Sequence, residues 1–163
     1  MSHMRDTLKR TKTLWILFVL TIVMTAAFGL VMYVWDFGII DEMHRANEIQ
    51  AHIDEMTSTQ RRVHIWMTAT LDAAYPLAYG GLFVGVALKF FGKLGPWLAF
   101  PSIAVIPVDL TEGVIQVLLL SGHMHVVGLK EIVTPLKLIL YLSGLSIMLI
   151  GLAAGAYRKL RSS

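Results

Sequence analysis

The sequence contains no cysteine and few charged residues. Only 15% of its 163 residues are Asp, Glu, Lys or Arg, whereas a soluble domain carries about 25%. The absence of cysteine excludes disulfides, thiolate nucleophiles and cysteine-ligated metals. There is also no glycine-rich phosphate loop, no His-Glu-x-x-His helix and no serine nucleophile elbow. Thiol chemistry and the common nucleotide-binding and hydrolase motifs are therefore excluded.

Hydrophobic residues make up 56% of the chain and are concentrated in four long runs. Each run reaches the length of about 20 residues that spans a bilayer. The runs cover approximately residues 14–35, 66–91, 97–120 and 132–157. The pattern predicts an all-α, polytopic membrane protein, a bundle of four transmembrane helices that forms a single domain over residues 1–163.

The segment between the first two runs, residues 36–65, is polar but periodic. Its apolar residues recur every three or four positions, as in an amphipathic helix: Met43, Ala46, Ile49, Ile53 and Met56. We expect this helix to lie on the membrane surface. Thr57 and Gln60 match a capping box, which predicts that the second long helix begins before its apolar run.

Basic residues predict the orientation. One group lies near both termini and between the second and third runs, and most acidic residues lie on the other side of the membrane. The positive-inside rule then places both termini in the cytoplasm of a bacterial inner membrane and residues 36–65 outside. The sparser basic residues assigned to the outer side are Arg45, Arg61, Arg62 and Lys130. Because basic residues lie at helix ends, we expect no nucleic-acid partner.

Ionisable and hydroxyl side chains interrupt three of the four runs. On each helix they recur at spacings of three or four, so they share a face: Asp72, Tyr75 and Tyr79; Asp109, Glu112 and Gln116; Lys137 and Tyr141. A rise of 1.5 Å per residue lets Asp72, Glu112 and Lys137 meet in the outer half of the membrane, with Asp109 just below. We predict a polar pocket that opens outward, with the amphipathic segment as its lid.

Three carboxyl groups against one lysine leave an excess of two negative charges in this pocket. Protons, a metal ion, water or a cationic ligand must neutralise that excess. Desolvation and like-charge crowding favour the protonated form of a carboxyl group, as a general acid requires. We therefore interpret Asp72, Asp109, Glu112, Lys137 and Tyr75 as catalytic candidates, with Gln116, Tyr79 and Tyr141 lining a substrate pocket. The structural alternative is an ion-pair network that fixes helix register.

Three histidines are predicted on the outer side: His64, His123 and His125. With Asp72 and Glu112 they could form a divalent metal site. Two of them could instead ligate haem, which we consider the weaker alternative. His123 and His125 lie in a loop flanked by glycines, where solvated histidines are common. The sequence is also compatible with a protein that has no cofactor, and a divalent metal is then the best alternative.

Glycines and prolines within the runs have simpler interpretations. Gly81-x-x-x-Gly85 and Gly151-x-x-x-Gly155 permit close helix packing, inside the bundle rather than between copies. Pro76 and Pro107 each remove a helical hydrogen bond. A kink is the simpler consequence, and a freed carbonyl ligand or a hinge is the functional alternative.

The segments TLDAAYPLAYG (residues 70–80) and PVDLTEG (residues 107–113) resemble a group of small, uncharacterised four-span bacterial membrane proteins. That group has Asp-x-x-(Phe/Tyr)-Pro opening the second span and Asp-x-x-Glu in the third. The resemblance covers about residues 60–120 and implies the same four-span topology. The commoner form has Asn where this chain has Gly113, so any role of that Asn is missing here.

Three functions are compatible with these patterns. The first is a membrane-embedded enzyme that uses acid–base chemistry on a lipidic or isoprenoid substrate: isomerisation, cyclisation, hydration or epoxide opening. Either Asp109 or Glu112 would protonate the substrate, and Asp72 would accept a proton or activate water. The second is a non-enzymatic subunit or assembly factor with a membrane-protein partner, or a homo-oligomer. The third is a proton- or cation-coupled carrier.

Overall fold

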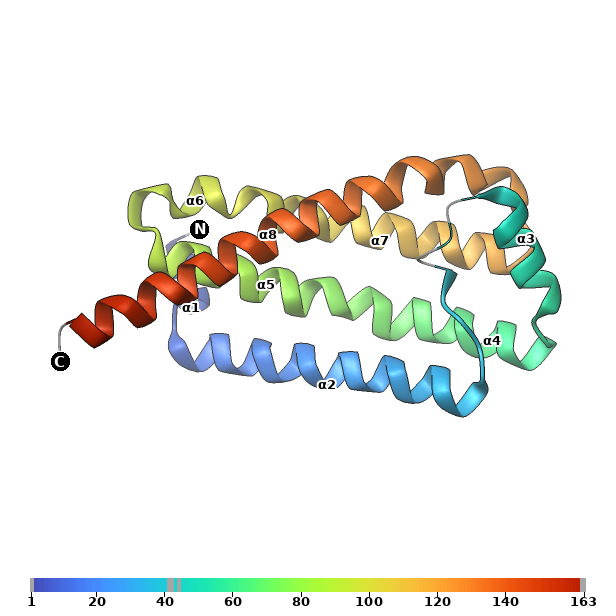
Figure 1. Ribbon diagram of the computed structural model, residues 1–163, viewed down its shortest axis with the longest axis horizontal. Helices are drawn as coiled ribbons and strands as arrows, with labels where there is room; N and C mark the ends of the chain where they lie inside the picture. Colours follow the sequence, from blue (N-terminus) through green and yellow to red (C-terminus); the bar gives the residue numbers. More distant parts are fainter. Residues whose placement is uncertain (1, 41–42, 44, 162–163) are drawn as a thin grey trace.

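The computed structural model describes residues 2–40, 43 and 45–161, and its regular structure is helical throughout (Figure 1). The long helices are α2 (Thr11–Trp35), the continuous run of α4 (Ser58–Met67), η2 (Thr68–Asp72) and α5 (Ala73–Phe90), α7 (Phe100–Leu120) and α8 (Val127–Arg161). The short ones are α1 (Ser2–Leu8), α3 (Ala46–Glu55), η3 (Gly92–Leu94), α6 (Gly95–Leu98) and η4 (Met124–Val126). No strand occurs within the described ranges.

Four helical stretches are long and apolar enough to cross a membrane, which confirms the predicted all-α bundle. The second and the fourth begin well before their apolar runs. The second begins at Ser58, where Thr57 Oγ1 accepts from the Gln60 amide and Gln60 Oε1 accepts from the Thr57 amide at 2.9 Å. The predicted capping box is therefore confirmed. The fourth begins at Val127, so residues 127–131, which precede its apolar run, are helical as well.

Helix α5 is the centre of the bundle. It packs against α2, α7 and α8, and α8 also packs along α7. Helix α2 lies against α5 and α4, so much of its surface is exposed outside the bundle (Figure 1). Helix α1 and the C-terminal end of α8 lie at one end of the molecule, and α3 lies at the other (Figure 1). Large apolar side chains on the outer faces of α2 and α8 suit contact with lipid.

Both glycine pairs pack within the chain, as predicted. A Cβ added at Gly85 would lie 2.7 Å from the backbone oxygen of Leu8 and 2.5 Å from Leu14 Cδ2. A Cβ added at Gly155 would lie 2.3 Å from the ring of Phe90. The absent side chains thus allow α5 to approach the N-terminal helices and α8.

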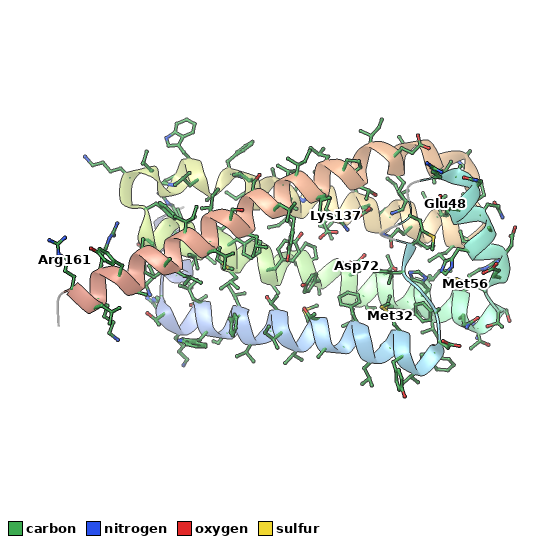
Figure 2. The ribbon with its side chains drawn as sticks, viewed as in Figure 1. Met32, Glu48, Met56, Asp72, Lys137 and Arg161 are labelled. Atoms are coloured by element: carbon green, nitrogen blue, oxygen red, sulfur yellow. The ribbon has the colours of Figure 1, made fainter. Side chains whose placement is uncertain are left out.

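The amphipathic helix predicted after the first span is present as α3, and its apolar face is buried against protein. Ile49, Ile53 and Met56 are buried against the end of the bundle, where they join a cluster that includes Leu119 and Leu120. Helix α3 therefore buries its apolar face against protein, so this face needs no contact with lipid. Figure 2 shows Glu48 and Met56 at this end, with Asp72 and Lys137 nearer the middle. Residues 41, 42 and 44 of the predicted outer segment lie outside the described residues.

A π-helical turn, η2, joins α4 to α5. The amide of Ala73 donates to the carbonyl of Thr68, five residues earlier. Pro76 follows Asp72 by four positions, so it cannot donate to the Asp72 carbonyl, and its ring would clash with that carbonyl in a regular α-helix. The wider turn relieves this clash. It places Asp72 at the junction of the two helical segments.

Candidate intramembrane acid site

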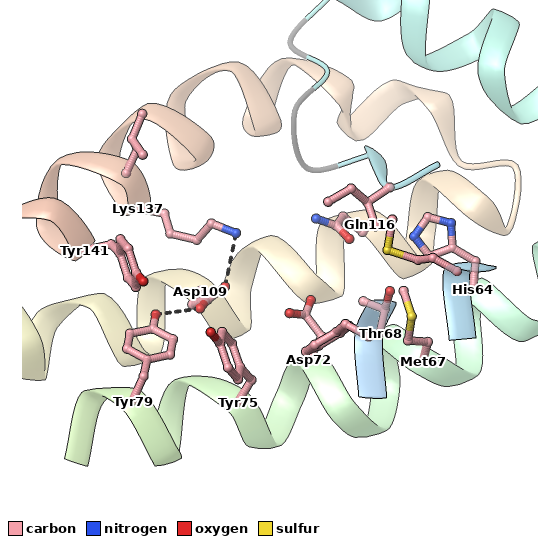
Figure 3. A pocket seen from close by; sticks show the side chains of 14 residues that line it. His64, Met67, Thr68, Asp72, Tyr75, Tyr79, Asp109, Gln116, Lys137 and Tyr141 are labelled. Atoms are coloured by element: carbon pink, nitrogen blue, oxygen red, sulfur yellow. Dashed lines mark hydrogen bonds and ion pairs between the residues drawn. The ribbon is translucent and has the colours of Figure 1, made fainter. Parts of the chain in front are cut away.

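A cavity of about 260 Å³ lies between α2, the α4–α5 run, α7 and α8 (Figure 3). All predicted pocket residues except Glu112 line it, together with one of the histidines predicted to bind a metal. These residues are His64, Asp72, Tyr75, Tyr79, Asp109, Gln116, Lys137 and Tyr141. Apolar residues from α2, from residues 37–40 and from α8 complete the wall. The structure therefore gathers the polar side chains of three helices around one cavity.

Asp109 is a buried carboxyl group that lines the cavity. Its side chain is 5% exposed. The Tyr79 hydroxyl donates to Oδ2 at 2.6 Å, and Lys137 Nζ lies 3.3 Å from Oδ1 (Figure 3). Each carboxylate oxygen thus has a partner on a different helix. This arrangement fixes the orientation of the carboxylate toward the cavity.

Glu112 lies one turn further along α7 and is fully buried. Lys130 Nζ lies 3.2 Å from its Oε1, Thr134 Oγ1 donates to the same oxygen, and Lys137 pairs with Oε2. Glu112 is therefore enclosed by α8 rather than open to the cavity. Its contacts join α7 to α8, and through Lys137 they join Glu112 to Asp109.

Lys130 was predicted in the connection before the fourth span, and that prediction is wrong because Lys130 belongs to α8. Its side chain is 0% exposed because α8 already includes it. The sequence carried a signal for this placement: Lys130, Thr134, Lys137 and Tyr141 follow one another at spacings of four, three and four. That spacing places all four on one face of a helix.

The second buried lysine changes the charge of the site. Three carboxyl groups now stand against two ammonium groups, so the formal excess is one negative charge instead of two. Lys130 and Lys137 balance Glu112 and Asp109. Asp72 is the third carboxyl group of the site. It is half-buried and lines the cavity from the π-helical turn, with its carboxylate directed toward α7 (Figure 3).

Three tyrosines surround Asp109 on the inner side of the cavity. The ring centroids of Tyr75 and Tyr79 are 5.1 Å apart, and those of Tyr79 and Tyr141 are 5.2 Å apart. The Tyr75 hydroxyl lies 3.1 Å from Thr25 Oγ1, which links α5 to α2. The cavity wall is thus aromatic with hydroxyl groups at its edges, which suits an apolar molecule that carries one polar group.

The histidines do not assemble as the predicted metal site requires. His64 is buried, stacks on Phe37 at 4.9 Å and lines the cavity. His123 and His125 are exposed in the turn between α7 and α8, outside the cavity lining, with ring centroids 5.9 Å apart. Among the described residues, no three His, Asp or Glu side chains are placed to hold a metal ion. The three histidines and the two acids are not brought together.

The site combines carboxyl, ammonium and phenol groups in a largely apolar cavity. Such groups can donate, accept and relay protons, and the low local polarity strengthens their effect on a bound molecule. Comparisons with protein-family models, with curated proteins and with solved structures found no match.

Proposed function

We propose that the protein is a membrane-embedded enzyme that performs acid–base chemistry on a hydrophobic substrate of the lipid or isoprenoid class. The observation that carries this proposal is the position of Asp109. It lines an aromatic cavity within a bundle of apolar helices, with one oxygen bound by Tyr79 and the other by Lys137. The reaction classes that need only a proton donor and a proton acceptor are isomerisation, cyclisation, hydration and epoxide opening.

Asp72 and Asp109 are the two carboxyl groups that can touch a molecule in the cavity. Their surroundings differ. Asp109 is buried and doubly bonded, whereas Asp72 is half-buried on the π-helical turn. Carboxyl groups in unequal surroundings can take opposite roles in proton transfer. One therefore donates a proton to the substrate, and the other accepts one or activates water.

Glu112 acts as a positioning residue in this proposal. It is fully buried, and Lys137 connects it to Asp109. Lys130 and Thr134 hold it from the other side. This contact network supports a role in fixing Lys137 beside Asp109 rather than direct contact with substrate.

We infer that the protein resides in a bacterial inner membrane with both termini in the cytoplasm. The clusters of Lys and Arg near α1, near η3 and at the end of α8 support this orientation. Helix α3 would then cover the outer end of the bundle. The cavity, which includes Ile39 from the segment before α3, would lie below that cover.

The experiment that tests the proposed enzyme first identifies a bound compound and then measures whether the protein converts it. Native mass spectrometry from mild detergent identifies a co-purifying lipidic compound, and reconstituted protein is then incubated with that compound. We expect conversion by the wild type and a loss of conversion in Asp109→Asn and Asp72→Asn. Glu131→Gln, an exposed acid on α8, is the matched control. Wild-type turnover in both Asp variants would refute the proposal.

A non-enzymatic subunit is the second candidate, and one observation favours it. Asp109 and Glu112 are each paired with a buried or half-buried lysine, as a purely structural lock between α7 and α8 would require. In that case the Asp109→Asn variant would lose stability or a co-purifying protein partner. No lipidic compound would change between wild-type and variant extracts.

A further inference from the structure

A second hollow reaches the same carboxyl groups from the other side of the α4–α5 run. It has a volume of about 380 Å³ and lies between the π-helical turn and α7. Thr68, Asp72 and Asp109 line both this hollow and the inner cavity. The two carboxyl groups therefore separate the inner cavity from this second hollow. We call the second hollow the lateral groove; its other lining residues are Ala69, Ala73, Leu110, Gly113, Val114, Val117 and Leu118.

The outer rim of the lateral groove faces the bilayer. Leu110 is 37% exposed and Val114 is 61% exposed, and both lie on α7, which belongs to a stretch long and apolar enough to span a membrane. Apart from Thr68 and the two carboxyl groups, every side chain that lines the groove is apolar. Hydrocarbon is therefore the medium that covers this face.

Gly113 keeps the groove open above Asp72. A Cβ added at Gly113 would lie 3.6 Å from Asp72 Oδ2 and 3.7 Å from Thr68 Cγ2. These are ordinary contact distances, so alanine would fit, but a longer side chain would extend over the carboxylate. The missing side chain thus leaves Asp72 uncovered on the lipid side.

Asp109 lies near the middle of α7, which runs from Phe100 to Leu120. At 1.5 Å per residue, it lies about 15 Å from either end of a helix that matches the hydrocarbon thickness. A molecule whose head group stays at the membrane surface would therefore present its chain, and not its head, to this carboxyl group.

We propose that the lateral groove is the route by which the substrate reaches Asp72 and Asp109 from the bilayer. This inference rests on the proposed function and narrows its substrate class. The substrate is a long-chain amphiphile or isoprenoid whose reacting carbon lies within the hydrocarbon part. Its chain occupies the apolar groove, and the inner cavity supplies Lys137 and the tyrosine hydroxyls on the far side of the carboxyl groups.

Carbodiimide labelling tests the route without knowledge of the substrate. A carbodiimide adds to a protonated carboxyl group and rearranges to a stable N-acylurea, so no atom is lost and the site is located by peptide mass spectrometry. The protein is reconstituted in phosphatidylcholine vesicles and treated with dicyclohexylcarbodiimide, which enters the bilayer, or with a water-soluble carbodiimide. We expect Asp72 to be labelled by the membrane-soluble reagent in preference to the water-soluble one.

Two variants should close the groove. Gly113→Leu places a side chain over Asp72, and Val114→Phe adds volume at the rim, where the native side chain is 61% exposed. Both should reduce labelling of Asp72 by the membrane-soluble reagent severalfold. Gly29→Leu is the matched control, because nothing lies within 4 Å of a Cβ added there. It should label like the wild type.

Several outcomes would overturn the lateral route. The first is that the membrane-soluble reagent does not label Asp72. The second is that both reagents label Asp72 equally. The third is that labelling of Asp72 is the same in Gly113→Leu and Val114→Phe as in the wild type. Labelling that falls as the protein-to-lipid ratio rises would instead show that a second copy covers the groove. If Asp72→Asn abolishes substrate conversion while the groove variants are labelled like the wild type, the proposed enzyme is supported and the lateral access route is refuted. If the groove variants block labelling but the Asp variants still convert substrate, the access route is supported and the catalytic role assigned to Asp72 and Asp109 is refuted.

Discussion

Lys130 Nζ lies 3.2 Å from Oε1 of Glu112, and neither side chain is exposed to the surface. The pair joins α8 to α7, and both helices belong to stretches long and apolar enough to span a membrane. Each charge would be costly in hydrocarbon without the other. The ion pair therefore allows α7 and α8 to pack together with both charged side chains buried between them.

Replacing Lys130 with methionine should destabilise the bundle. The change keeps the length of the side chain but leaves Glu112 with Lys137 as its remaining charged partner. Removal of one member of a buried pair costs about 3–5 kcal/mol in soluble proteins, so a loss of several kcal/mol is expected. Unfolding in a denaturing detergent titration measures it.

The control for this substitution is Lys93→Met, which removes an exposed lysine from η3. The double variant Lys130→Met/Glu112→Leu should be more stable than the sum of the two single changes predicts, because the pair is then absent as a unit. Additive effects would show that the two side chains do not interact energetically.

Tyr79→Phe removes the hydroxyl that binds Asp109 at 2.6 Å. Loss of a buried hydrogen bond to a charged group costs about 1–3 kcal/mol. Under the proposed function, the reoriented carboxyl group should also slow substrate conversion. Detergent unfolding and turnover are measured beside Tyr33→Phe, whose ring is 85% exposed. Equal stability and turnover in both variants would contradict the role assigned to Tyr79.

Gly85→Ala and Gly29→Ala should change stability in opposite directions. A methyl group at Gly85 meets the Leu8 carbonyl and Leu14, so the helices must separate. At Gly29 nothing lies within 4 Å, so alanine should stabilise the helix by about 0.5–1 kcal/mol. Unfolding midpoints of the two variants provide the comparison. A stabilised Gly85→Ala would show that α1 and α2 do not pack on α5 as described.

The proposed orientation can be tested by cysteine labelling, since the chain has no cysteine of its own. Asn47→Cys on α3 should react with a membrane-impermeant maleimide in intact cells from which the outer membrane has been removed. Lys93→Cys on η3 should react only after the membrane is permeabilised. Both positions are exposed, so their reactivity reports the side of the membrane. The reverse pattern would invert the topology.

The sequence was sufficient to predict the four long helices, because apolar runs of that length have few alternatives. It also predicted the start of the second helix from Thr57 and Gln60. The position of α3 could not be predicted in the same way. An apolar face such as that of Ile49 and Ile53 can be buried by lipid or by protein, and the periodicity is the same in both cases.

The sequence predicted which residues line the site better than it predicted which of them form ion pairs with one another. The helical spacing of Asp109, Tyr79 and Lys137 indicated a shared pocket, and all three line one cavity. Lys130 was missed because its place near a turn suggested the membrane surface. Its spacing to Thr134 and Lys137 would have indicated the buried face. The pairing of Glu112 with both lysines depends on the distance between α7 and α8, which no single helix pattern determines.

The π-helical turn at Thr68–Asp72 accommodates one extra residue within the second long helix. Because a π-turn holds one residue more than an α-turn, deleting Ala69 should let an ordinary α-helical turn form while α4 and α5 keep nearly the same facing. His64 and the capping box would then keep their present neighbours, and Asp72 would lose the widened turn that carries it. Homologues one residue shorter in this turn would therefore be expected to keep both halves of the helix aligned and to differ at the position of Asp72.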